Sequence, residues 1–146
     1  MNINPPPISQ GWGDARSGPI PIWALWFQNV WENTPKEATG NLVIAAASGS
    51  ITSYTATYRY VKIGNFGTLL FDITISNAGT GAGDLNVTIP YTASSNITGA
   101  AREVLVTGYQ CSCSGVAGST FGVRKYDNLT IIATGHHIVG QVNYFV

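Results

Sequence analysis

Charged side chains are scarce in this sequence. Lysine, arginine, aspartate and glutamate make up only 10% of its 146 residues, against roughly 25% in an ordinary soluble domain. Seven basic residues balance seven acidic ones. No basic surface is therefore available to neutralise phosphates, and we expect no nucleic-acid partner. A net charge near zero favours association, which suits a protein that works inside an assembly.

Long apolar runs are missing as well. No stretch approaches the roughly 18 apolar residues that a membrane-spanning helix needs. The start of the chain, MNINPPPISQ, lacks the basic and apolar segments of a signal peptide. We therefore expect a chain made in the cytoplasm, with no membrane partner. Only two cysteines are present, and both are expected to be reduced there.

Residues that bind metals are few and poorly spaced for that purpose. Cys111 and Cys113 lie two positions apart, and His136 and His137 are adjacent, whereas structural zinc sites use wider pairs. On strands, the cysteines would point the same way and pack as small apolar residues. The histidines would point in opposite directions, at a strand start or a subunit contact, and a pH-sensitive histidine stays an open alternative.

Recognisable catalytic motifs are also missing. No G-x-S-x-G elbow is present, and the glycine-rich GTGAGD joins two strands instead of opening a helix. Asp72 and Asp84 flank one predicted hairpin but fit turn or solvent-facing positions, so glycoside hydrolysis has little support. The N-x-T sequons at Asn86, Asn96 and Asn128 would matter only in a secretory chain. We expect no catalytic residues, no cofactor and no metal.

What the sequence does contain divides it into two unlike parts. Residues 1–40 hold six of the seven prolines and all four tryptophans, and residues 41–146 hold nearly all the β-branched residues. The first part predicts an extended proline-rich arm and a short helix at about 21–33, between prolines that can open and close it. The second part predicts a β domain.

The predicted helix has the strongest pattern in the chain. Its large apolar residues recur at the spacing of one helix face, at Trp23, Trp26, Phe27, Val30 and Trp31. They would present about 600–1,000 Å² of apolar surface, more than the largest patch of a typical monomer. The chain's own sheet, sister subunits or another protein must cover this face. The helix carries no Lys or Arg, which argues against a membrane surface. Together with Trp12, these residues form the predicted anchoring or interface set.

Residues 41–146 show the period of two that strands require. Alternation is regular in 54–61 and 69–75, and Gly64-Asn65 between them can form a tight hairpin turn. The residues expected to face inward are Leu69, Phe71, Ile73 and Ile75, and then Leu85, Val87 and Ile89. Further strands are predicted at 85–89, 102–112, 119–125, 129–134 and 138–146, with a turn at 126–128. About eight short strands with frequent turns predict a mainly β fold, a jelly-roll-like antiparallel β-sandwich.

Residues 58–94 resemble a module of tailed-bacteriophage virion proteins. In that family a Y-x-K-x-G strand end leads into an apolar strand, a Gly- and Thr-rich loop, and a G-x-x-x-I-x-x-L-P strand that ends in an aromatic residue. The matching positions are Tyr60, Lys62, Gly64, Gly79, Gly83, Leu85, Val87, Ile89, Pro90 and Tyr91. Ile89 stands where the family usually has Leu, and the aromatic–Pro opening that commonly precedes the module is missing.

The resemblance implies a jelly-roll-like sandwich, usually a homotrimer, as in capsid-decorating (cement) proteins and fibre tips, with no catalytic residues. A fibre protein normally has a long stalk, which this chain lacks. We therefore expect a non-enzymatic decoration protein on the capsid surface of the virion, with its arm and helix bound to the major capsid protein or another virion protein. The alternative is a fibre tip that binds a host receptor or glycan through loop aromatics such as Tyr91, Tyr109 or Tyr126. A third, an enzyme such as a depolymerase, has the least support.

Overall fold

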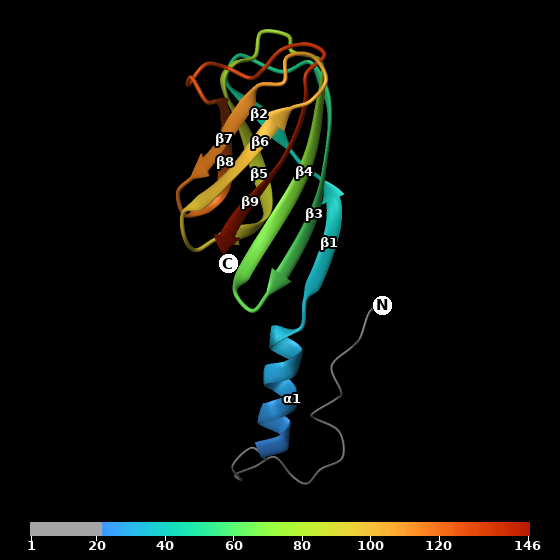
Figure 1. The fold of residues 1–146 in the computed structure, drawn as a ribbon, viewed down its shortest axis with the longest axis vertical. Coiled ribbons are helices and arrows are strands. Elements are labelled where there is room, and N and C mark those ends of the chain that lie inside the picture. Colours follow the sequence, from blue (N-terminus) through green and yellow to red (C-terminus); the bar gives the residue numbers. More distant parts are fainter. Residues whose placement is uncertain (1–21) are drawn as a thin grey trace.

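The structure is a computed structural model, and it describes residues 22–146 (Figure 1). The predicted arm and Trp12 lie outside the described residues. Within them, one helix precedes nine strands. The elements are α1 (Ile22–Asn33), β1 (Lys36–Asn41), β2 (Ile44–Ser48), β3 (Ser53–Ile63), β4 (Phe66–Asn77), β5 (Ala82–Ala93), β6 (Ile97–Glu103), β7 (Gln110–Gly115), β8 (Gly118–Lys125) and β9 (His137–Phe145).

The helix ends where side chains bond back to its last carbonyls. Asn33 Nδ2 donates to Asn29 O (2.8 Å), and Thr34 Oγ1 donates to Val30 O (2.7 Å). Pro35 follows, and a proline disfavours helical geometry in the residue before it. The predicted helix at about 21–33 is confirmed.

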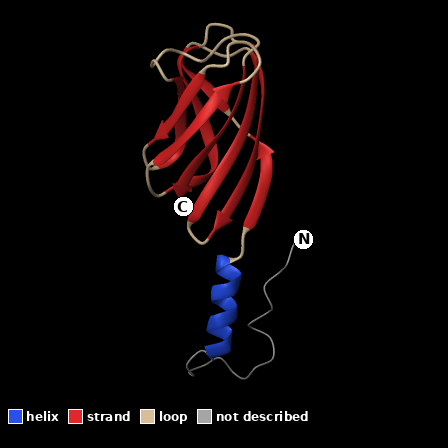
Figure 2. Ribbon diagram, viewed as in Figure 1, coloured by secondary structure: helices blue, strands red, loops and turns tan. Residues whose placement is uncertain are grey.

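The nine strands form one antiparallel sheet, in the order β1-β3-β4-β9-β6-β7-β8-β5-β2. The pairs β6–β7, β5–β8 and β4–β9 are nested in sequence, as in a jelly roll. Figure 2 shows the sheet curled around its own interior. The mainly β, jelly-roll-like class predicted from the sequence is confirmed.

The two edge strands of the sheet, β1 and β2, follow each other in the chain. Leu42 N donates to Ala56 O of β3, while Val43 O accepts from Thr88 N of β5 (both 2.9 Å). This short link carries the chain from the β3 edge to the β5 edge. The two edges of the curled sheet therefore come together at residues 42–43, between β1 and β2.

The core lies inside the curl and follows the predicted alternation. The residues predicted to face inward on β4 and β5 are all buried: Leu69, Phe71, Ile73, Ile75, Leu85, Val87 and Ile89. Gly64 adopts φ +59° in the β3–β4 turn, a conformation open to glycine but costly for most other residues. Both the inward face and the hairpin turn are thus confirmed.

Two predicted strands are wrong. The 102–112 segment is interrupted: β6 ends at Glu103, residues 104–109 form a loop, and β7 starts at Gln110. The apolar stretch before Gly108 leaves the sheet because its amides bond to the Glu103 carboxylate. The 129–134 segment forms no strand either. Its isoleucines, Ile131 and Ile132, lie in the 126–136 loop and are buried against the core.

Strands β1 and β2 were not predicted. Their sequences, KEATGN and IAAAS, lack large alternating apolar residues, so tertiary pairing with β3 and β5 decides their conformation. The sheet therefore begins at Lys36, a few residues before the start of the predicted β domain at 41.

Candidate functional site

The molecule has two unlike ends. Helix α1, the β3–β4 turn and the C-terminus lie at one end, which we call the base (Figure 1). Loops gather at the opposite end, which we call the tip (Figure 2). The tip loops are 49–52, 78–81, 104–109 and 126–136. Each end exposes apolar side chains, so each is a candidate functional surface.

Helix α1 exposes apolar side chains on more than the predicted face. Trp26 is 60% exposed, and Trp23, Phe27 and Val30 are about half exposed. Leu25, which was not part of the predicted set, is exposed too. Figure 1 shows the helix standing below the sheet instead of lying across it. A helix that is apolar on most sides is normally buried in an assembly or a large core.

Aromatic contacts fix the rings of the helix against one another. The Trp26 and Phe27 ring centroids lie 5.0 Å apart, and those of Trp23 and Phe27 lie 6.3 Å apart, both edge-on. Trp31 differs from the rest, since it is only partly exposed and Lys36 Nζ lies 5.7 Å from its ring centroid. The helix thus presents an ordered aromatic surface.

The base of the β domain continues this apolar surface. Ile63, Phe66 and Phe145 are exposed at the ends of β3, β4 and β9, and the two phenylalanine rings lie edge-on, 5.4 Å apart. The end of α1 lies beside them, because Asn33 Oδ1 is 3.4 Å from the position of a Cβ built on Gly64. This cluster could not be predicted from the sequence, since its members come from separate strand ends.

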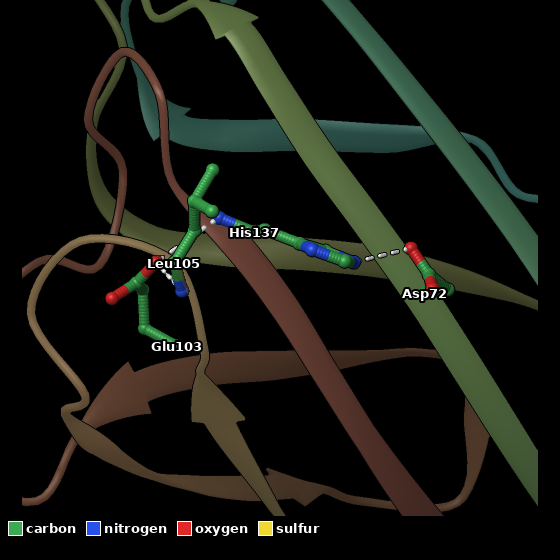
Figure 3. Close-up of polar contacts among 4 residues, drawn as sticks. All are labelled: Asp72, Glu103, Leu105 and His137. Carbon is green, nitrogen blue, oxygen red and sulfur yellow. Dashed lines mark hydrogen bonds and ion pairs between the residues drawn. The ribbon is translucent and has the colours of Figure 1, made fainter.

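At the tip, Glu103 organises the 104–109 loop (Figure 3). Its side chain is fully buried. Its carboxylate accepts hydrogen bonds from the amides of Leu105, Val106, Thr107 and Gly108, from the Thr107 hydroxyl, and from His137 N at 3.3 Å. Burial alone would raise the Glu103 pKa, but the amide bonds lower it overall to far below its ordinary 4.5.

The loop that Glu103 holds is apolar and exposed. Leu105 is 68% exposed and Val106 is 62% exposed, and Val104 beside them is about half exposed. Leu129, from the neighbouring 126–136 loop, is also exposed. Sequence reasoning missed this surface because Val-Leu-Val was interpreted as part of a strand.

The tyrosines proposed for receptor binding do not form one site. Tyr109 and Tyr126 are exposed in tip loops. Tyr91 lies instead in β5, near the base, where its ring is 4.8 Å from that of buried Tyr60. The structure therefore brings two of the three to the same end.

Figure 3 also shows a histidine between two carboxylates. His137 Nε2 lies 2.9 Å from Asp72 Oδ1 on the outer face of the sheet, while His137 N bonds to Glu103. This resembles an acid–base pair, but the Glu103 oxygens are already occupied by amide and hydroxyl donors and are closed to solvent. Glu103 is therefore a structural carboxylate. As predicted, the two histidines diverge: His136 is buried, with Nδ1 2.8 Å from Ile131 O.

The outer face of β3, β4, β9 and β6 has a shallow depression of about 570 Å³. Its charged lining residues are already paired: Arg59 bonds to Glu37 at 3.0 Å, and Asp72 to His137. Among residues 22–146, no group of three or more His, Cys, Asp and Glu side chains is placed to hold a metal ion. The same part of the chain contains no helix long and apolar enough to cross a membrane.

The two cysteines point into the core from β7, as predicted. Both are free and buried. Burial, and then the neighbouring Cys111 thiol, raise the pKa of Cys113 to about 12. A thiol with so high a pKa is almost entirely protonated at neutral pH and is a poor nucleophile.

Comparisons of the chain with protein-family models, with curated proteins and with solved structures found no match.

Proposed function

We propose that the chain is a non-enzymatic virion structural protein, a capsid-decorating protein that works as a homotrimer and uses helix α1 to bind the phage head. One observation carries the proposal: α1 stands clear of the β domain and exposes Trp26, Phe27 and Val30. Exposure of several large apolar residues on an ordered helix costs free energy unless a partner covers them. The adjoining base residues, Phe66 and Phe145, enlarge the surface that a partner would cover.

The energetics suit an adhesive role. Complete burial of one large apolar side chain stabilises a complex by about 1.5–3 kcal/mol. Burial of several exposed apolar side chains on α1 and the base would therefore stabilise a complex several times over. The free-energy cost of association reduces this gain. In a trimer, three helices bind together and the effective concentration raises the overall affinity. The β domain has a core of its own and projects from the shell.

The test uses phage heads assembled without this chain. Wild-type protein is expected to sediment with the heads, and the double variant Trp26→Ala/Phe27→Ala is expected to lose at least tenfold in affinity. Val43→Ala is the matched control, because Val43 is 63% exposed but lies on the β1–β2 link. Equal binding by the wild type and the double variant would refute anchoring by the helix.

The alternative is a fibre tip that binds a host receptor or surface glycan. The observation in its favour is the exposure of Tyr109 and Tyr126 at the end opposite the helix. Binding of the full chain to host cells would support this alternative if Tyr126→Ala abolishes it. If the same variant still binds phage heads, the two roles are separable.

A further inference from the structure

Two lysines lie opposite each other where helix α1 meets the β domain. Lys36, the first residue of β1, is the register partner of Lys62, near the end of β3. Residues directly opposite on antiparallel strands have Cβ atoms about 4.5–5.5 Å apart, and like charges at such positions are destabilising. The base therefore holds two ammonium groups close together, and we call them the lysine pair.

The described part of the chain does not neutralise the lysine pair. Among residues 22–146, no ion pair joins Lys36 or Lys62 to an acidic side chain or to the carboxylate of Val146. Glu37, the acid next to Lys36, is bonded to Arg59 at 3.0 Å. Successive residues of a strand point to opposite faces, so this ion pair lies on the other face of the sheet.

The lysine pair interrupts the apolar surface of the helix and the base. Lys36 Nζ lies 5.7 Å from the centroid of the Trp31 ring at the end of α1. On the other side, Ile63 follows Lys62 directly and is exposed. A partner that covers both α1 and the base must therefore cover the lysine pair too. Without acidic groups of its own, that partner would leave two like charges buried and unpaired, which is costly.

Protection of a sheet edge does not account for both lysines. Strand β1 lies at an edge of the sheet, and lysine on an edge strand discourages pairing with other chains. Lys62, however, is on β3, which lies between β1 and β4, and its side chain is only partly exposed. An interior strand needs no such protection. Binding of an anionic group explains why a second lysine stands opposite the first.

The surroundings favour protein over lipid as the source of that group. An amphipathic helix that binds a bilayer carries Lys or Arg on its polar face. The polar face of α1 instead carries Glu32, which accepts a hydrogen bond from Gln28 (3.0 Å). Tryptophan is enriched in the energetic hot spots between proteins. We propose that the protein site that receives α1 carries acidic side chains, which pair with Lys36 and Lys62 when the complex forms.

This inference rests on the proposed function, because the acidic partner is the surface of the phage head that α1 would bind. It adds the chemistry of that surface. Opposite charges across an interface speed association and disfavour wrong partners. Acidic groups of the partner would also remove the repulsion within the lysine pair, so the pair binds more favourably than it rests in the free chain.

The test measures binding of the full chain to undecorated phage heads at low and at high salt. Wild-type affinity is expected to fall as salt rises, because salt screens charge attraction. Lys36→Gln/Lys62→Gln is expected to bind about tenfold more weakly at low salt and to lose most of the salt dependence. Arg102→Gln/Lys125→Gln is the matched control. It removes two positive charges next to the tip loops and is expected to bind like the wild type.

A second comparison needs no phage heads. Lys62→Glu places a carboxylate opposite Lys36, whereas Lys62→Gln only removes a charge. Because opposite charges attract across paired strands, Lys62→Glu is expected to unfold at a higher urea concentration than Lys62→Gln. Of the two variants, Lys62→Glu is nevertheless expected to bind phage heads more weakly, since its carboxylate repels an acidic partner.

Four results would overturn the inference. The first is equal affinity and equal salt dependence of the wild type and Lys36→Gln/Lys62→Gln; loss of binding by Trp26→Ala/Phe27→Ala would then leave the proposed function intact. The second is a urea midpoint no higher for Lys62→Glu than for Lys62→Gln, which would mean that the pair is already neutralised. The third is a wild type that binds no phage heads at any salt, which contradicts the proposed function itself. The fourth is flotation of the wild type with phosphatidylglycerol vesicles that the double lysine variant loses, which would assign the pair to lipid.

Discussion

The β domain buries most of its large apolar side chains, whereas helix α1 exposes most of its own. The β domain folds nine strands into one curled sheet and buries Leu69, Ile73, Leu85 and Val123 almost completely. The helix carries a denser set of large apolar residues and leaves most of them exposed. The difference indicates that the domain supplies its own stability, whereas the role that we propose for the helix requires a partner to cover its side chains. Perturbations should therefore separate folding from assembly.

Loss of the Glu103 carboxylate should have the largest effect on folding. Glu103→Ala leaves several loop amides without an acceptor, and we expect the free energy of unfolding to fall by roughly 3 kcal/mol. Glu37→Ala is the matched control, since Glu37 is exposed in a surface ion pair with Arg59 and should change stability by about 1 kcal/mol or less. Urea unfolding measures both. Equal effects would mean that the tip loop is not held by its carboxylate.

A methyl group added inside the curl should cost somewhat less. A Cβ on Gly99 would lie 2.0 Å from Gln141 O and 2.8 Å from Val142 Cα. Because both are backbone atoms of β9, Gly99→Ala should destabilise the domain by about 1–3 kcal/mol. Gly122→Ala is the control, since its nearest neighbour lies at 3.6 Å. If thermal unfolding shows no difference between the two, the β6–β9 approach is looser than described.

Acid should remove the stability that the Glu103 carboxylate contributes to the domain. The Glu103 pKa is lower in the folded protein than its ordinary 4.5, so the folded state favours the ionised form. The resulting stability is present above pH 4.5 and is lost as the pH falls from there toward the folded pKa. The stability difference between wild type and Glu103→Gln should therefore shrink in acid. A difference that stays constant from neutral to acid pH contradicts this assignment.

The smallest expected effect is the reaction of the buried Cys113 thiol in the native protein. With a pKa of about 12, Cys113 is about one part in 10⁴ thiolate at pH 8, so a thiol reagent should barely react with it in the native protein. Both cysteines should react once urea unfolds the domain. Rapid native labelling of Cys113 would show that the curl opens locally. Trp26→Ala should leave this protection unchanged, because the helix does not cover the core.

Local patterns in the sequence were sufficient to predict those elements whose conformation depends mainly on neighbouring residues. The helix, the Gly64-Asn65 turn and the inward face of β4 follow from spacing alone. The tip could not be predicted, because Glu103 looks like any surface acid until the chain folds its own amides onto it. Strands β1 and β2 could not be predicted for a related reason. They lack large alternating apolar residues, so pairing with β3 and β5 determines their conformation. The base cluster forms only where separate strand ends meet.

One measurement tests the central claim that α1 is the element of assembly. All four tryptophans lie in residues 1–40, so tryptophan emission reports on the arm and helix and not on the β domain. With 5-hydroxytryptophan incorporated to separate its signal from that of the capsid, the emission should shift to the blue and become resistant to acrylamide when the chain binds undecorated phage heads. Binding that leaves the emission and its quenching unchanged would contradict the account, because the helix would remain in water while the protein is attached.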